Sequence, residues 1–203
     1  LLGWSQQHLM RATPQDKNSP AFVLPRGSVM FIGVLCFIMF LSEGSILDWS
    51  ALFLISERGV STAQAGIGYA AFSVAMTVGR LTGDRVVNRL GRFAILTGGT
   101  LCASLGLLLA IEVDHPVAAI TGFVMVGLGA SNVVPILFSA AGNQNIMSPN
   151  LAVAAITTVG YAGILLGPTL LGFIAKLSNL ATAFGVVAGL LLIVCASARA
   201  VTR

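Results

Sequence analysis

The sequence predicts an all-α integral membrane protein with six transmembrane helices. Only 9% of its 203 residues are charged and 56% are hydrophobic, whereas about 25% of the residues of a soluble domain are charged. A helix that crosses a bilayer needs roughly 20 mostly apolar residues, and the apolar run at 93–111 lacks the alternating polarity of barrel strands. Six such stretches are expected, near residues 28–54, 62–83, 93–113, 116–141, 150–176 and 180–198.

The first 27 residues form a different kind of segment. They contain three prolines and three Lys or Arg residues, and they lack the apolar core of a signal peptide. We therefore expect residues 1–27 to be a cytosolic linker and residues 28–203 to form the helical bundle with a short cytosolic tail. Because the chain begins at Leu1 with a linker, we also expect it to be a fragment of a longer protein.

The distribution of basic residues predicts how the bundle is oriented. If the linker is cytosolic, six spans place nine Lys and Arg residues on the cytosolic side and only Arg58 and Lys176 on the other side. Cytosolic loops carry an excess of basic residues, so both termini of the segment are expected in the cytosol. The formal charge of +4 is then a topology signal and requires no nucleic-acid partner. The nine residues are Arg11, Lys17, Arg26, Arg80, Arg85, Arg89, Arg92, Arg199 and Arg203.

The first span contains the motif FLSEGSILDWSALF, in which Glu43 lies well inside an apolar run. A carboxylate at that depth costs several kcal/mol unless it faces a cavity or a partner. Glu43 is therefore a candidate for substrate or proton handling, with a structural hydrogen bond as the alternative. Asp48 lies about 140° further around a regular helix, so the two acids share a face only if the helix breaks, for which Gly44 is the candidate. Asp48 and Trp49 are further candidates for substrate handling, and the alternative for Trp49 is an interfacial anchor.

A charged stretch, GRLTGDRVVNRLGR, occupies residues 79–92 after the second span. It surrounds a single carboxylate, Asp84, with four arginines, and we expect it to be a cytosolic loop. Small residues recur every four positions up to this stretch, at Ala71, Ala75, Gly79 and Gly83. Such a row allows another helix to approach closely, so helix packing is favoured here over substrate contact.

The fourth and fifth spans each contain a proline. Pro135 lacks a backbone donor and clashes with the carbonyl four residues earlier, so we expect a break beside Asn132. The amide of Asn132 is then either a ligand facing a lumen or one partner of an interhelical hydrogen bond. In the fifth span, Gly167 and Pro168 are expected to interrupt the helix. Tyr161 is a candidate substrate contact, with simple packing as the alternative.

The sequence shows no apparatus for catalysis or cofactor binding. An intramembrane serine protease would need a histidine base on a membrane helix, but His8 and His115 lie in the predicted linker and in an outer loop. The three cysteines, Cys36, Cys102 and Cys195, lie on different spans and supply neither a disulfide framework nor metal-ligand spacing. We therefore expect no enzymatic activity, no metal and no cofactor.

Taken in order, the charged stretch and the motifs EGSILDW, GLGASNVVP and GYAGILLGP resemble the C-terminal half of a major facilitator superfamily transporter. Within that family they look most like bacterial inner-membrane permeases related to the fucose permease, and the resemblance covers residues 28–198. It implies one six-helix bundle of a twelve-helix fold, whose N-terminal bundle is missing from this chain. The two bundles of such a fold rock about a cavity at the membrane midplane.

The resemblance also implies roles for particular residues. Glu43 and Asn132 would line the cavity, and the charged stretch would act as a gate. Asp84 would face the positive N-terminal end of a helix in the missing half, while the arginines after it pair locally and hold the cytosolic side closed. The implied gate consists of Gly79, Gly83, Asp84, Arg85, Arg89, Gly91 and Arg92.

The implied function is secondary active transport of a small solute across the bacterial inner membrane, with H+ as the candidate coupling ion. The partners would be the solute, the lipid bilayer and the missing N-terminal half. The alternative is a non-transporting membrane scaffold or sensor built on the same bundle. A buried Glu43 favours transport, because a scaffold has little reason to keep costly polar groups in its core.

Overall fold

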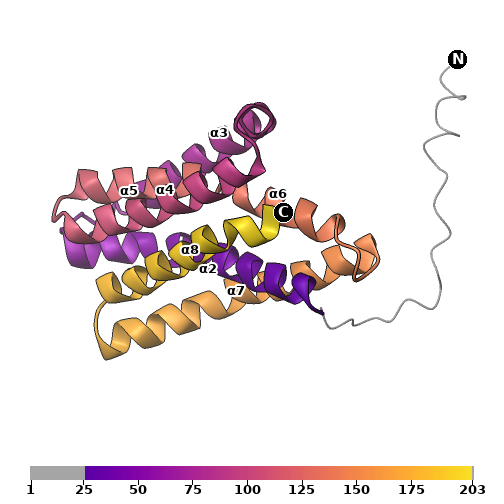
Figure 1. Ribbon diagram of the computed structural model, residues 1–203. Coiled ribbons are helices and arrows are strands. Elements are labelled where there is room, and N and C mark those ends of the chain that lie inside the picture. The colour runs from indigo at the N-terminus through magenta and orange to yellow at the C-terminus, as the bar shows by residue number, and fades with distance from the viewer. Residues whose placement is uncertain (1–25, 203) are drawn as a thin grey trace, which may run out of the picture.

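The structure is a computed structural model that describes residues 26–202, and these residues are almost entirely helical. The helices are labelled in Figure 1. They are α2 (Ser28–Arg58), α3 (Ile67–Leu90), α4 (Arg92–Glu112), α5 (Pro116–Ala130), α6 (Val133–Gly142), α7 (Pro149–Leu177) and α8 (Leu180–Thr202). The all-α prediction is confirmed, whereas nearly all of the predicted linker lies outside the described residues.

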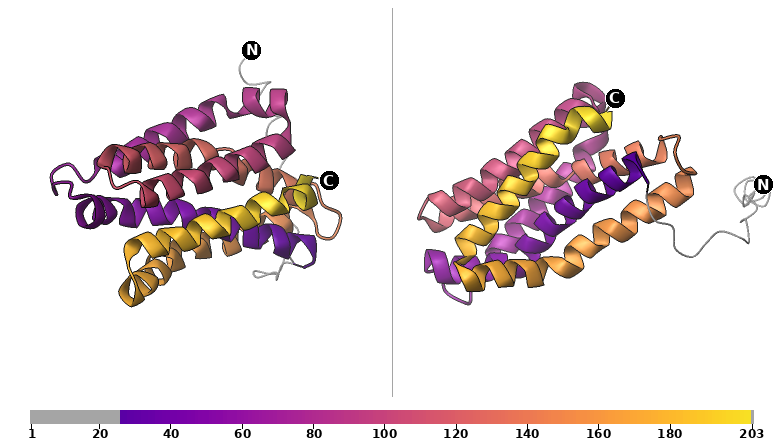
Figure 2. Two further views of the ribbon diagram at one scale, coloured as in Figure 1. Left: turned by 60° about the vertical axis from the view of Figure 1, so that its left-hand side comes forward. Right: turned by 60° about the horizontal axis from the view of Figure 1, so that its bottom comes forward.

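The helices form a bundle in which the described chain runs six times from one end to the other. The start of α2, the α6–α7 link and the end of α8 lie at one end, and the α2–α3, α4–α5 and α7–α8 links lie at the other (Figures 1 and 2). Five of the crossings are long and apolar enough to span a bilayer, and one of these joins α5 and α6. α3 is long enough at 24 residues, but charged side chains in its C-terminal half lower its hydropathy. Those side chains belong to Arg80, Asp84, Arg85 and Arg89.

Most of the stretch that was expected to be a cytosolic loop is helical, so that prediction is wrong. α3 continues to Leu90 because residues 79–90 contain no proline, and their arginines and leucines favour a helix. The helix ends at Gly91, whose φ of 83° glycine adopts without steric cost. α4 begins at the next residue. Arg80 consequently lies within a helix and not in a loop.

Two predicted helix breaks are also absent. α2 runs unbroken through Gly44, and α7 runs unbroken through Gly167 and Pro168. A glycine inside a helix costs about 1 kcal/mol relative to alanine, and close packing offsets that cost here. A side-chain carbon on Gly44 would lie 3.5 Å from the Cα atom of Ile164 in α7.

The fourth crossing does break. α5 ends at Ala130 and α6 begins at Val133, with Ser131 and Asn132 in a turn between them. Pro135 is the third residue of α6, where the backbone N–H of a helix has no intrahelical acceptor. The helix break is therefore located just before the proline, where its missing donor costs little.

α7 packs on α2 through a row of glycines. A side-chain carbon on Gly160 would meet the ring of Phe40, and one on Gly163 would collide with the carbonyl of Phe37. Helices that associate in a bilayer depend on such close packing, because lipid tails remove the hydrophobic driving force. The face of α7 that carries the small residues is thus the face that contacts α2.

α4 and α5 touch backbone to backbone through two glycine pairs. A side-chain carbon on Gly99 would collide with the carbonyl of Gly129, and one on Gly129 would collide with the carbonyl of Gly99. Gly106 and Gly122 are related in the same reciprocal way. The two reciprocal pairs fix both the distance between these helices and their alignment along the bundle.

Candidate functional site

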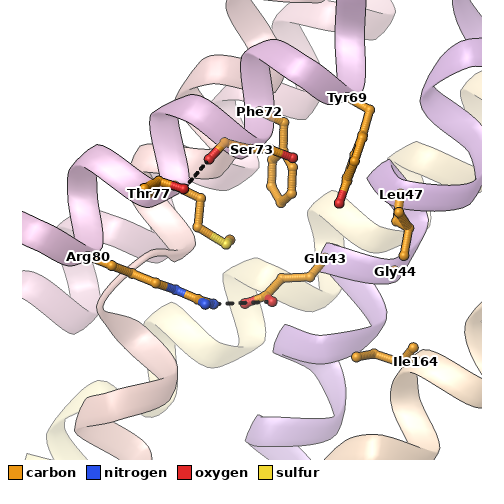
Figure 3. A pocket seen from close by; sticks show the side chains of 10 residues that line it. Glu43, Gly44, Leu47, Tyr69, Phe72, Ser73, Thr77, Arg80 and Ile164 are labelled. Atoms are coloured by element: carbon orange, nitrogen blue, oxygen red, sulfur yellow. Dashed lines mark hydrogen bonds and ion pairs between the residues drawn. The ribbon is translucent and has the colours of Figure 1, made fainter. Parts of the chain in front are cut away.

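A cleft of about 320 Å³ lies between α2, α3 and α7 (Figure 3). It opens near the middle of α2, which is the depth at which a transmembrane helix is furthest from water. Two of its lining side chains are charged, one acidic and one basic. The lining residues are Glu43, Gly44, Leu47, Tyr69, Phe72, Ser73, Met76, Thr77, Arg80 and Ile164.

Glu43 and Arg80 face each other across this cleft. Nη2 of Arg80 lies 3.5 Å from Oε2 of Glu43. The side chain of Glu43 is 14% exposed and that of Arg80 is 50% exposed. The other carboxylate oxygen, Oε1, is buried and has no hydrogen-bond partner among the described residues. Since an unpaired buried charge is strongly disfavoured, Arg80 makes an ionised Glu43 tolerable at this depth.

The α3 wall of the cleft carries polar residues that the sequence patterns did not single out. Tyr69, Ser73, Thr77 and Arg80 are spaced by four, four and three residues, so they share one face of the helix. The hydroxyl of Thr77 donates to the carbonyl of Ser73 over 2.8 Å, and the hydroxyl of Tyr69 points towards α2 (Figure 3). This polar stripe is visible in the sequence, but assigning Arg80 to a cytosolic loop hid it.

The structure does not bring Asp48 or Trp49 to the cleft. Because α2 does not break at Gly44, Asp48 stays on a different face of the helix from Glu43 and is exposed. The indole of Trp49 packs against α7, 3.1 Å from where a side-chain carbon on Gly172 would lie. Neither residue is therefore positioned to act together with Glu43 in the described half.

Asn132 makes an interhelical contact. Its amide nitrogen donates to the carbonyl of Gly79 and to the hydroxyl of Ser131, each over 2.9 Å. Its amide oxygen lies so close to Gly83 that a side chain there would collide with it. The hydrogen bond that was the alternative for Asn132 is thus present, and the small-residue row on α3 makes room for it.

The expected gate residues lie on the last turns of α3 and at the start of α4. Asp84 lines a second pocket, of about 250 Å³, together with Arg92 and Asn132. Among residues 26–202, no ion pair within 4.0 Å involves Asp84, Arg85, Arg89 or Arg92. Neighbouring residues on a helix point about 100° apart, which turns Arg85 away from Asp84, while Arg80 reaches Glu43 instead. The gating role of this segment stays a prediction.

Tyr161 borders the cleft without lining it. Its ring stacks on that of Phe40, with centroids 5.2 Å apart and planes 10° apart, and the residue is 54% exposed. Phe40 lies three residues before Glu43, and Tyr161 lies three before Ile164, so the stacked pair is about one helical turn from the cleft. The stack supports packing between α2 and α7, and it leaves much of the tyrosine accessible.

Arg58 makes a contact that the charge count did not anticipate. Its Nη2 donates to the carbonyls of Ala110 and Ile111 at the end of α4, each over 2.7 Å, and its Nη1 lies 3.4 Å from Asp114. The guanidinium carbon also lies 4.9 Å from the centroid of the Phe53 ring. The last carbonyls of a helix lack intrahelical donors, so Arg58 caps α4 and joins it to α2.

Comparison with known proteins gives one consistent result. The family model described as the Major Facilitator Superfamily matches residues 6–144. The chain is 63% identical over 203 residues to an MFS-type transporter of Yersinia pestis, covering 100% of this chain and 53% of that protein. It is 34% identical over 196 residues to the membrane protein MosC of Rhizobium meliloti, covering 96% of this chain and 48% of that protein. The chain thus spans about half the length of the curated relatives it matches.

A solved structure shares the fold of this chain. The crystal structure of the E. coli fucose:proton symporter FucP superimposes with a TM-score of 0.77 over 88% of this chain and 43% of that one. Sequence identity over the match is 16%, so the likeness concerns the fold alone. The matched region makes up 43% of the FucP chain, which is about half of that longer helical protein.

Proposed function

The chain belongs to the major facilitator superfamily, a family of membrane transporters, and we propose that it forms the C-terminal half of a secondary active transporter. The complete protein moves a small solute across the bacterial inner membrane by alternating access. The linker end and the C-terminal end of this half lie on the cytosolic side. In this arrangement a missing N-terminal bundle supplies the opposite wall of the solute site.

The observation that carries this proposal is the Glu43–Arg80 pair in the cleft. A membrane helix keeps an ionisable residue at midspan when that residue serves a pathway for solute or ions. Here the two charged groups lie on different helices, 3.5 Å apart, and they line one cavity together with Ile164 of α7. Movement of α2 relative to α3 would change their separation directly.

Glu43 is the proposed proton-handling group of this half. When its carboxylate takes up a proton, the attraction to Arg80 is lost and the pair separates easily. When the proton leaves, the pair forms again and draws α2 and α3 together. Proton binding is in this way linked to the geometry of the cleft, as coupling between a proton and a solute requires.

The test uses the full-length protein in proteoliposomes that enclose a pH-sensitive dye. Addition of labelled sugars, amino acids and small organic acids in turn should identify a solute whose entry carries protons inward down an imposed pH gradient. Replacement of Glu43 by glutamine should lower that coupled uptake by at least about tenfold, because an amide cannot exchange the proton. The amount of folded protein should not change.

The matched control is Asp48→Asn, which neutralises an acid on the same helix outside the cleft. This variant should retain the uptake of the unchanged protein. Equal uptake by the Glu43→Gln variant and the unchanged protein at every pH would contradict the role of Glu43. A full-length protein that moved none of these solutes would favour the scaffold or sensor instead.

A further inference from the structure

The turn between α5 and α6 is hydrogen-bonded to α3 directly before Arg80. Nδ2 of Asn132 donates to the carbonyl of Gly79 over 2.9 Å, and Gly79 is the residue before Arg80 in α3. Building on the proposed transport function, we propose that Asn132 is a positioning residue, which holds α3 so that Arg80 faces Glu43 across the cleft. Asn132 is not among the residues that line this cleft, so it acts there through Arg80.

α3 is held in the bundle mainly by α5 and the α5–α6 turn. Its contact with α5 is much more extensive than its contact with α2, because the side of α3 that faces α2 borders the cleft. In the first half of α3 the two backbones meet, since a side-chain carbon on Gly127 in α5 would collide with the carbonyl of Phe72. The distance between Arg80 and Glu43 therefore depends on what α3 packs against behind the cleft.

Two small residues bring the turn close to α3 on either side of Arg80. A side-chain carbon on Gly79 would collide with the hydroxyl of Ser131, and one on Gly83 would collide with the amide oxygen of Asn132. Such close packing leaves α3 little room to rotate. Because the long side chain of Arg80 magnifies any rotation of its helix, a loosened turn displaces the guanidinium more than the backbone.

The hydrogen bond from Asn132 fixes the rotation of α3 as well as its distance from the turn. Within α3 the carbonyl of Gly79 accepts the helical bond from the residue four positions later, and a carbonyl has a second lone pair for another donor. Asn132 donates to that carbonyl and also to the hydroxyl of Ser131, each over 2.9 Å. The first of these bonds forms when the carbonyl of Gly79 points at the turn, which sets the face of α3 that borders the cleft.

The Arg80–Glu43 pair is too weak to set its own geometry. Its two atoms are 3.5 Å apart and the arginine side chain is 50% exposed, and an ion pair of that kind contributes little to holding two helices together. The pair therefore forms where the surrounding helices place its two groups. Asn132 supplies the polar contact nearest to Arg80 on the far side of α3.

The first experiment measures the width of the cleft in the full-length protein in lipid nanodiscs, with its native cysteines replaced. Spin labels are attached after Leu47→Cys and Thr77→Cys, two positions that line the cleft on α2 and α3 (Figure 3), and electron paramagnetic resonance gives the distance between them. Asn132→Leu keeps the branched shape of the side chain and removes its donor. It should shift the mean distance by about 2 Å, the size of a typical helix shift.

Two controls separate positioning from general loosening of the bundle. Asn143→Leu is the matched variant, because Asn143 donates to the carbonyl of Ser139 in its own helix, and it should leave the distance unchanged. A second label pair, at Leu47→Cys and at the exposed Leu165→Cys on α7, should not respond to the change at Asn132. An equal shift in both label pairs would contradict the positioning role.

Gly83→Ala tests the same contact from the α3 side. Its added carbon displaces the amide of Asn132, so it should shift the distance across the cleft as Asn132→Leu does. This variant alone decides the question if Asn132→Leu does not fold. An unchanged distance in Gly83→Ala would overturn the proposal.

The second experiment asks whether Asn132 acts through the ion pair. Asn132→Leu alone should lower proton-coupled uptake at least about fivefold, but less than about twofold when Glu43→Gln is already present, because effects that share one contact are not additive. A loss that is equally large in both backgrounds would show that Asn132 has a purely structural role. Asn143→Leu should leave uptake unchanged in either background.

The distance measurement needs no solute, so the two proposals can fail independently. A protein that shows the expected shift but carries no solute would overturn the transport function and leave the positioning role in place. A protein that transports a solute, and whose distance across the cleft does not respond to Asn132→Leu, would overturn the positioning role and leave the transport function in place.

Discussion

Two arginine–carboxylate pairs in this bundle have nearly the same length and opposite burial. Arg58 lies 3.4 Å from Asp114, with the arginine side chain 6% exposed and the acid 89% exposed. Arg80 lies 3.5 Å from Glu43, with the arginine 50% exposed and the acid 14% exposed. In the first pair the protein buries the cation, and in the second it buries the anion.

The difference separates a structural contact from the one on which the proposed function rests. Arg58 is stabilised chiefly by two backbone carbonyls, which are fixed and always present. Glu43 has one partner, at a distance too long for a strong hydrogen bond, and one oxygen without a partner in the described chain. The Arg58 side chain thus has two fixed partners on another helix, whereas Glu43 has one long contact to a half-exposed arginine.

The strongest challenge to this comparison is Arg58→Ala. We expect the free energy of unfolding of the full-length protein to fall by about 3 kcal/mol, because two hydrogen bonds from a charged donor are lost at about 1.5 kcal/mol each. Reversible unfolding in detergent measures this change. Arg58→Lys is the matched control and should restore part of the loss, since its ammonium can still reach one carbonyl. A loss below about 1 kcal/mol would show that Arg58 is no more structural than a surface charge.

Arg80→Ala should have a smaller effect, a loss of about 1 kcal/mol of unfolding free energy. The exposed half of its side chain contributes little packing, and the carboxyl that it leaves behind can take up a proton and avoid the cost of a buried charge. The same unfolding measurement applies. A loss as large as that expected for Arg58→Ala would erase the distinction between the two pairs.

Glu43→Gln should change the unfolding free energy less still, and the change should depend on Arg80. With Arg80 present, the variant loses a weak ion pair and also loses a buried charge, so the two effects nearly cancel. When Arg80 is already replaced by alanine, Glu43→Gln removes no ion pair. A double-mutant cycle should therefore give a coupling energy of about 1 kcal/mol or less, and a larger coupling would identify the pair as a structural contact.

The smallest expected effect is that of Asp114→Asn, below about 0.5 kcal/mol, as for other exposed ion pairs. The carboxylate is almost fully exposed, and Arg58 keeps both of its carbonyl contacts without it. Unfolding at low and high salt provides the check, because an exposed pair that does contribute is weakened by screening. A salt-dependent loss comparable to that of Arg58→Ala would show that the exposed acid is essential.

The sequence was sufficient to predict the helical membrane bundle and to single out Glu43 as a candidate. Long apolar stretches leave few structural alternatives in a bilayer, because every backbone polar group must be satisfied within the segment. An acid inside such a stretch also requires an explanation from its environment. Both inferences depend on local composition, which a single sequence contains in full.

The partner of Glu43 could not be predicted in this way. Arg80 is 37 positions further along the chain, and pairing across two helices depends on where α3 ends and how it is rotated. Arg80 falls near the end of the expected span 62–83 and was counted with the cytosolic charges, whereas the helix continues to Leu90. A correct end for α3 would have shown that Arg80 shares a face with Tyr69 and Thr77.

Whether each predicted helix break occurs depends on how the helix packs against its neighbour. Gly44 and Pro168 have the chemistry of helix breakers, but α2 and α7 pack so closely that both helices continue. At Asn132 the break persists next to Pro135, which lacks a backbone donor, and the amide of Asn132 donates to the carbonyl of Gly79 on α3. Whether a residue of this kind interrupts a helix depends on the neighbouring helix, which is information that local sequence does not contain.

The two reciprocal glycine pairs between α4 and α5 have a mechanical consequence. Where backbone meets backbone at Gly99–Gly129 and again at Gly106–Gly122, sliding one helix along the other would push a side chain into a space that only hydrogen atoms fit. The hairpin therefore resists shear in both directions. The α4–α5 pair is therefore expected to behave as one rigid unit, so any relative motion of the helices is expected at other contacts of the bundle.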